Sequence, residues 1–117
     1  MALTITKKGD AKLQLDGTSL ELDSVYARLE MVLRPDGKSV DASLYLYDAK
    51  ASYTSGKNRV KINAINKDGE GNDTSKTLQT FYRVSLIDGK AQSLGDIHDA
   101  VKTLVASDGY TVTKKDL

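Results

Sequence analysis

Apolar and polar residues alternate along the middle of the chain, and the clearest run extends from Val25 to Leu33. An apolar residue at every second position is the pattern of a β-strand with one buried face. A second run of this kind extends from Val40 to Tyr47. Between the runs, residues 35–38 read Pro-Asp-Gly-Lys, and this proline and glycine suit the backbone angles of a tight turn. The pattern therefore predicts one long β-hairpin.

Shorter alternating segments predict further strands on both sides of this hairpin. Apolar pairs spaced by two residues indicate three short strands, at Leu3 and Ile5, at Leu13 and Leu15, and at Leu20 and Leu22. Later strands are expected over residues 59–65, 78–87 and 110–113, followed by a frayed tail over residues 114–117. The strand over residues 78–87 has apolar residues on both faces, which favours a central or doubly covered place in a sheet.

Two segments have the pattern of helices. Residues 48–56 begin with Asp48 as an N-cap acid and end with a glycine, so a turn or two of helix or 3₁₀ structure is expected there. A longer helix is expected over residues 93–107, where Ser93 can cap the first turn and Asp96 follows three residues on. Its apolar stripe consists of Leu94, Ile97, Val101, Leu104 and Val105.

The stretch from Asn66 to Lys76 has no apolar residue, which predicts a solvated loop, mobile in the free protein. Its acids, asparagines and glycines raise the question of calcium. The spacing does not match an EF-hand loop, which needs oxygen ligands at positions one, three and five and a glutamate at position twelve. Calcium binding is therefore the alternative to a plain hydrophilic loop.

Together these elements predict a single domain over residues 1–117. The expected fold is mainly β, a β-sandwich or a barrel-like antiparallel sheet, with one C-terminal α-helix packed on it. A chain of this length buries roughly two-thirds of the surface that its unfolded form exposes, so one core is expected. The pattern does not fix the order of the strands.

Composition excludes several classes of protein. Lys plus Arg number 17 against 16 for Asp plus Glu, and the two signs alternate along the chain, so neither nucleic acid nor an anionic membrane is expected as a partner. The absence of cysteine excludes disulfides and thiolate sites. The first residues lack the apolar region of a signal peptide, and no stretch approaches the ~20 apolar residues of a membrane span, so synthesis in a cytoplasm is expected.

Residues that could carry catalysis do not occur as a set. The single histidine, His98, is expected on the surface of the helix, and no motif supplies the nucleophile and orienting group that a general base needs. The nine glycines are scattered among turns without a phosphate-binding pattern, and no pair of carboxylates has a pocket signature around it. We therefore expect no enzyme, no cofactor and no metal site.

Tyrosines on the polar face of the predicted hairpin are candidates for an interface. Tyr26 lies on the outward face of the first strand, and Tyr45 and Tyr47 lie on that of the second. An aromatic ring supplies a large contact area at low entropic cost, and its hydroxyl can still hydrogen bond. Tyr53, in the short helical segment, completes the candidate set. The alternative is cross-strand pairing beneath a second sheet or a helix.

Three successive segments occur in an order that is found elsewhere. Residues 24–30 read Ser-Val-Tyr-Ala-Arg-Leu-Glu, the second hairpin strand ends Tyr-Leu-Tyr at residue 47, and residues 48–57 read Asp-Ala-Lys-Ala-Ser-Tyr-Thr-Ser-Gly-Lys. Over about residues 20–57 this succession resembles small proteins encoded among the structural genes of tailed bacteriophages and prophages. The resemblance implies no catalytic residues.

That resemblance implies a virion component of the neck, the tail or the capsid decoration, or a helper of their assembly. The implied partners are other virion proteins or copies of the chain in a homo-oligomer, and the implied location is the virion, after synthesis in the cytoplasm of the producing cell. Exposed strand edges and the polar loop could join neighbours by strand addition.

A second class of function stays open beside the virion component. It is a soluble binding module, either a glycan-binding or surface-binding domain whose outward tyrosines stack on sugars, or an inhibitor of a host protein. Glycan-binding domains usually expose tryptophan as well as tyrosine, and this sequence has no tryptophan.

Overall fold

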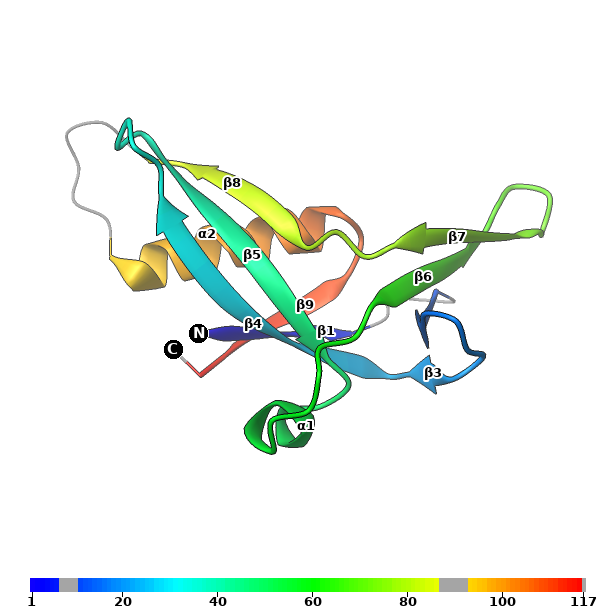
Figure 1. Ribbon diagram of the computed structural model, residues 1–117. Coiled ribbons are helices and arrows are strands. Elements are labelled where there is room, and N and C mark those ends of the chain that lie inside the picture. Colours follow the sequence, from blue (N-terminus) through cyan, green and yellow to red (C-terminus); the bar gives the residue numbers. More distant parts are fainter. Residues whose placement is uncertain (7–10, 87–92, 117) are drawn as a thin grey trace.

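The computed structural model of the protein describes residues 1–6, 11–86 and 93–116, which form two antiparallel sheets and two helices (Figure 1). The strands are β1 (Ala2–Thr6), β2 (Lys12–Leu15), β3 (Glu21–Leu22), β4 (Ser24–Leu33), β5 (Ser39–Tyr47), β6 (Ile62–Lys67), β7 (Asp73–Thr77), β8 (Phe81–Ser85) and β9 (Thr111–Lys115). The helices are α1 (Lys50–Thr54) and α2 (Leu94–Ser107). The larger sheet has the order β8-β5-β4-β1-β9 and the smaller sheet the order β3-β2-β6-β7.

The predicted long hairpin lies in the larger sheet as strands β4 and β5. The two strands pair antiparallel, from Tyr26 opposite Tyr47 to Leu33 opposite Val40. In the turn, Gly37 has a φ of +69°, a conformation that favours glycine. The hairpin prediction is therefore confirmed.

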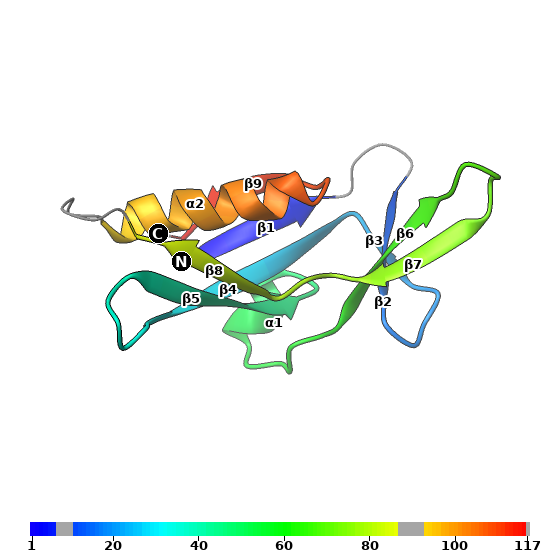
Figure 2. The ribbon, with the colours of Figure 1, turned by 90° about the horizontal axis from the view of Figure 1, so that it is seen from above.

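Helix α2 covers one face of the larger sheet, and α1 lies on the opposite side (Figure 2). The predicted capping box is present: the Asp96 N–H donates to the Ser93 hydroxyl at 3.1 Å, and the Ser93 N–H donates to the Asp96 carboxylate at 3.0 Å. The expectation of a mainly β antiparallel fold with one C-terminal helix packed on it is confirmed. Within the described residues, neither helix is long and apolar enough to cross a membrane.

The core lies between α2 and the sheets and is mostly aliphatic. Its fully buried members come from the strands and from α2, so the inward residues of the alternating pattern are the ones that pack together. The largest side chains with almost no exposure are Leu3, Ile5, Leu13, Ile62, His98, Val25, Val101 and Val105.

His98 is part of this core, so its predicted place on the helix surface is wrong. The side chain is 0% exposed, and its Nε2 lies 2.7 Å from the carbonyl oxygen of Ala2 in β1. An α-helix turns by about 100° per residue, so His98 lies only about 20° from Val105, seven residues on. The apolar stripe is therefore wide enough to include the histidine. Leu94, one turn before Ile97, is 64% exposed instead.

Strands β6 and β7 form a hairpin, residues 62–77, here called the arm, whose far end projects from the body (Figure 1). Near its base, residues 62–65 of β6 also pair with β2, and Ile62 and Ala64 are buried in the core. The predicted polar loop over residues 66–76 is therefore wrong at both ends, because Asn66 pairs with Thr74 and Lys67 with Asp73. Backbone pairing of this kind needs no apolar side chain. Residues 68–72 form the turn, which we call the tip of the arm.

Four further expectations differ from the structure. Strand β8 is an edge strand and not a central one, and its outer face is open, with Phe81 47% exposed. Lys114 and Lys115, predicted in a frayed tail, pair with β1 as part of β9. Helix α1 begins after Ala49, without a side-chain cap, instead of after an acid at position 48. The strand expected from residue 59 begins at Ile62, and position 87, predicted to end another, lies outside the described residues.

Candidate interaction surface

The face of the larger sheet opposite α2, here called the outer face, carries the outward side chains of β4 and β5. Tyr26 and Tyr47 are direct neighbours across these strands. Helix α1 follows β5 and places Tyr53 over the pair, with its ring centroid 6.0 Å from that of Tyr26 and 5.3 Å from that of Tyr47. The structure therefore brings three of the four predicted tyrosines into one cluster.

Tyr26 is used within the molecule. It is only 5% exposed, and its hydroxyl donates to the carboxylate of Asp116 and accepts from Nη1 of Arg28 at 3.2 Å. Burial, followed by the hydrogen bond to Asp116, raises the pKa of Tyr26. Asp116 also pairs with Lys50 of α1 at 2.8 Å, so the residues around this tyrosine tie the end of the chain to α1 and β4. This arrangement agrees with the alternative of cross-strand pairing beneath a helix.

Tyr53 and Tyr47 keep part of their surface accessible. Tyr53 is 39% exposed, and the guanidinium of Arg28 lies 4.7 Å from its ring centroid. Tyr47 is half-buried. Their place in an interface stays a prediction.

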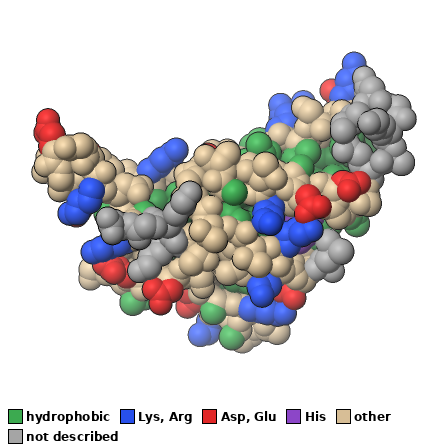
Figure 3. Space-filling view, turned by 180° about the vertical axis from the view of Figure 1, so that it is seen from behind, with side chains coloured by type: hydrophobic (Ala, Val, Ile, Leu, Met, Phe, Trp, Pro, Cys, Tyr) green, Lys and Arg blue, Asp and Glu red, His purple; other side chains and the backbone are tan. Residues whose placement is uncertain are grey.

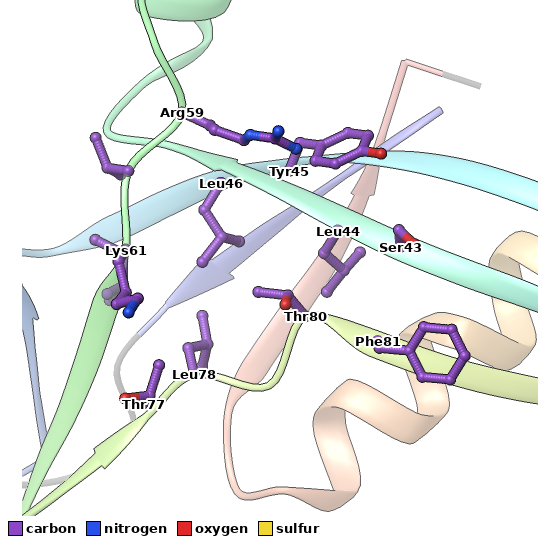
Figure 4. Close-up of a pocket in the computed structure, with 12 residues that line it drawn as sticks. Ser43, Leu44, Tyr45, Leu46, Arg59, Lys61, Thr77, Leu78, Thr80 and Phe81 are labelled. Carbon is purple, nitrogen blue, oxygen red and sulfur yellow. The ribbon is translucent and has the colours of Figure 1, made fainter.

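Tyr45 stands apart from this cluster and stacks with Arg59. The guanidinium carbon of Arg59 lies 4.6 Å from the ring centroid of Tyr45, a cation–π contact (Figure 4). A hydrogen bond to Glu30, followed by burial, raises the pKa of the Tyr45 hydroxyl. Tyr45 therefore meets a carboxylate at its hydroxyl and a guanidinium over its ring.

Two hollows flank this stacked pair, and we refer to both together as the groove. The first, of about 460 Å³, lies between β5, the chain leading into β6, and the link from β7 to β8 (Figure 4). It is lined by Ser43, Leu44, Tyr45, Leu46, Arg59, Val60, Lys61, Ile62, Thr77, Leu78, Thr80 and Phe81. The second, of about 450 Å³, is lined by Tyr45, Tyr47, Lys57, Asn58 and Arg59.

The basic segment, residues 57–61, runs along the groove from α1 to β6. Its cations, Lys57, Arg59 and Lys61, stand at alternate positions and are exposed. Val60 between them is half-buried, and its N–H donates to the carbonyl of Leu46 at 2.8 Å, which fixes the segment beside β5. Over the part of the chain that the structure describes, none of the three cations forms an ion pair.

Sequence reasoning missed this segment. Cations alternate over residues 57–61 of the sequence, but the near-neutral net charge of +1 gives no indication of a local positive segment. Its position beside Tyr45 depends on how the chain returns from α1 to β6, which the pattern does not reveal. Phe81, which lines the first hollow and is 47% exposed, was missed as well.

A mixed ionic group lies on the outer face near Phe81. Asp41 accepts from Nε of Arg83 at 2.8 Å and from Nη1 of Arg34 at 3.2 Å. The hydrogen bond from Arg83 lowers the pKa of Asp41. Asp41 therefore offsets one of the two arginine charges in this part of the outer face, whereas no described carboxylate forms an ion pair with the basic segment.

Side chains that could bind a metal do not gather in one place in the described part of the chain. Residues 1–6, 11–86 and 93–116 contain no group of three or more His, Asp or Glu placed to hold an ion. At the tip of the arm, Asp68 accepts from the N–H groups of Glu70 and Asn72, both at 2.9 Å, so its carboxylate holds the turn. Calcium binding there stays a prediction.

Comparison of the chain with known protein families, with curated proteins and with solved structures found no match. Function is therefore inferred from the surface just described and from the resemblance seen in the sequence.

Proposed function

We propose that the chain is a non-catalytic structural or assembly component of a tailed-phage virion, which works through protein–protein contacts in a multi-copy assembly. Its partners would be other virion proteins or copies of itself. It would be made in the cytoplasm of the producing cell and reside in the virion. The virion assignment rests on the resemblance over about residues 20–57.

The observation that carries this proposal is the arm. All five residues of β7 are exposed, and β7 forms the open edge of the smaller sheet. An exposed edge strand offers unpaired backbone groups to another chain. An edge strand as exposed as β7 gains stability when a partner covers it, as subunits in rings and shells cover one another.

The position of His98 supports a non-catalytic role. The imidazole is 0% exposed, and its Nε2 is bound to a backbone carbonyl, so substrate cannot reach it. A general base must lie within hydrogen-bond reach of the proton that it takes.

Quantitative mass spectrometry of purified particles tests the proposal. A fixed number of copies per particle, matching a ring or shell symmetry, is the expected result. Absence of the chain from particles, together with its abundance in the producing cell, would contradict the virion role.

A soluble binding module is the second candidate, and the groove is the observation that favours it. Tyr45, Tyr47 and Arg59 line its second hollow, and aromatic rings beside a guanidinium can hold a sugar or a peptide. A glycan array, read with and without calcium, distinguishes the sugar-binding form of this candidate. An array without hits would remove that form.

A further inference from the structure

We propose that the tip of the arm of one copy docks into the groove of a second copy. This inference rests on the proposed function, because it names the contact by which copies would assemble. The occupant of the groove is thus a second copy of this chain, and the contact joins two different surfaces.

Charge is the first reason for this pairing. Within residues 1–6, 11–86 and 93–116, no acidic residue lines either hollow of the groove, and Lys57, Arg59 and Lys61 form no ion pair. Three cations at alternate positions of one short segment create a local positive field in a chain whose net charge is only +1. The surface that complements this positive segment is one with carboxylates and no cation.

The tip of the arm is such a segment. Residues 68–72 contain Asp68 and Glu70 and no Lys or Arg, and Figure 3 shows acidic side chains at the far end of the arm. Glu70 is exposed and forms no ion pair within the described ranges. Asp73, at the start of β7, is neutralised by Lys67 at 2.6 Å, so it adds little to the field.

The shape of the tip suits the groove. Two of its five residues are glycines, Gly69 and Gly71, so the tip carries few side chains, and a Cβ added to either glycine would meet nothing within 4 Å. The first hollow, of about 460 Å³, can hold a few side chains but not a domain. Its apolar lining includes Leu44, Leu46 and Leu78, with Tyr45 at the side (Figure 4).

The fold prevents a chain from filling its own groove. The arm begins at Ile62, directly after the basic segment, so the base of the arm lies at the groove. Six residues of β6 place the tip roughly 20 Å away from that base. A contact between tip and groove therefore joins different copies head to tail, and a repeated head-to-tail contact produces a ring or a filament.

Charge reversal in the full chain tests this docking by analytical ultracentrifugation at low and high salt. The arm variant is Glu70→Lys, and the groove variant is Lys57→Glu with Lys61→Glu. All three side chains are exposed and outside the described ion pairs, so folding should be preserved, and circular dichroism checks this. Each variant should associate about tenfold or more weakly than the wild type, because like charges then face each other. The chain that carries all three substitutions should recover association.

The outcomes separate this inference from the proposed function. Weaker association of both the arm variant and the groove variant, together with restored association of the triple variant, supports arm docking. Equal association of all four proteins, or loss in the groove variant alone, overturns it, since another surface or another acidic segment then makes the contact. A wild-type chain that stays monomeric at the highest concentration reached also overturns it. The copy number in particles tests the virion role independently of each of these results.

Discussion

At the scale of single residues, His98 shows how a polar side chain can hold a core together. Its Nε2–H is the donor to the carbonyl of Ala2 at 2.7 Å, which links α2 to the first strand of the larger sheet. The other ring nitrogen, Nδ1, has no hydrogen-bond partner among residues 1–6, 11–86 and 93–116. Burial of an unpaired acceptor costs free energy, so the gain from packing the ring and from the Nε2 bond must exceed this cost.

Replacement of this histidine by alanine is expected to destabilise the protein strongly. His98→Ala removes a buried hydrogen bond and leaves a cavity, which together should lower the free energy of unfolding by about 2–4 kcal/mol. Urea denaturation followed by circular dichroism measures the change. Thr103→Ala, at an exposed position of the same helix, is the matched control and should cost much less. Equal stabilities of the two variants would show that the imidazole is not a structural link.

At the scale of elements, helix α2 is fixed by local sequence at its start. Ser93 and Asp96 exchange hydrogen bonds through side chain and backbone, which satisfies N–H groups that the first turn leaves without partners. The side of α2 that faces the sheet then buries Ile97, Val101 and Val105. Capping sets where the helix begins, and burial sets which way it faces.

Removal of the cap gives the second prediction. Ser93→Ala should lower the free energy of unfolding by about 1 kcal/mol, the usual effect of losing an N-cap side chain. Ser93→Asp keeps an acceptor for the Asp96 N–H and should stay close to the wild type. Thermal melting of the three proteins, compared at one pH, distinguishes loss of the cap from a general intolerance of substitution at this position.

The elements that sequence could predict are those that bury one face. The hairpin of β4 and β5 and helix α2 leave periods of two and about 3.6 residues in the hydrophobic pattern, because one side of each packs on the core. Strand β7 leaves no such period, since it is exposed on both faces and is held by backbone pairing. The groove escaped prediction for a different reason. The sequence contains both Tyr45 and Arg59, but it does not show that they stack, because this depends on the path of the chain between β5 and β6.

At the scale of the whole molecule, the protein is extended. Its radius of gyration is 15.3 Å, against about 13 Å for a compact chain of this length, and it measures 48 × 38 × 22 Å. The excess fits the projection of the smaller sheet and its arm beyond the larger sheet (Figure 1). Strand β7 and the tip of the arm have little burial to hold them, so they are expected to open more readily than the body that α2 covers.

Ion pairs spread over the molecule link its stability to pH. Four carboxylates have a pKa lowered by a cationic partner: Asp41 by Arg83, Asp73 by Lys67, Asp99 by Lys114 and Asp116 by Lys50. A carboxylate whose pKa is lower in the folded than in the unfolded state binds more protons when unfolded. Its contribution to the stability of the folded state is therefore present above the pKa of the unfolded state, about 3.9 for Asp, and is lost as the pH falls through the pKa of the folded state.

Acid titration of stability tests this linkage. The urea midpoint of the wild type should change little between about pH 7 and pH 5 and then fall below about pH 4. The reason is that the pKa values of the four aspartates are lower than usual only while the protein is folded. Asp41→Asn should be less stable than the wild type at neutral pH, and the difference should shrink as the acid protonates the wild-type carboxylate. High salt should also reduce the fall, since these pairs are solvent-exposed and therefore screened. Parallel curves for the two proteins at every pH would show that Asp41 and its arginines contribute nothing to acid sensitivity, and that other groups cause it.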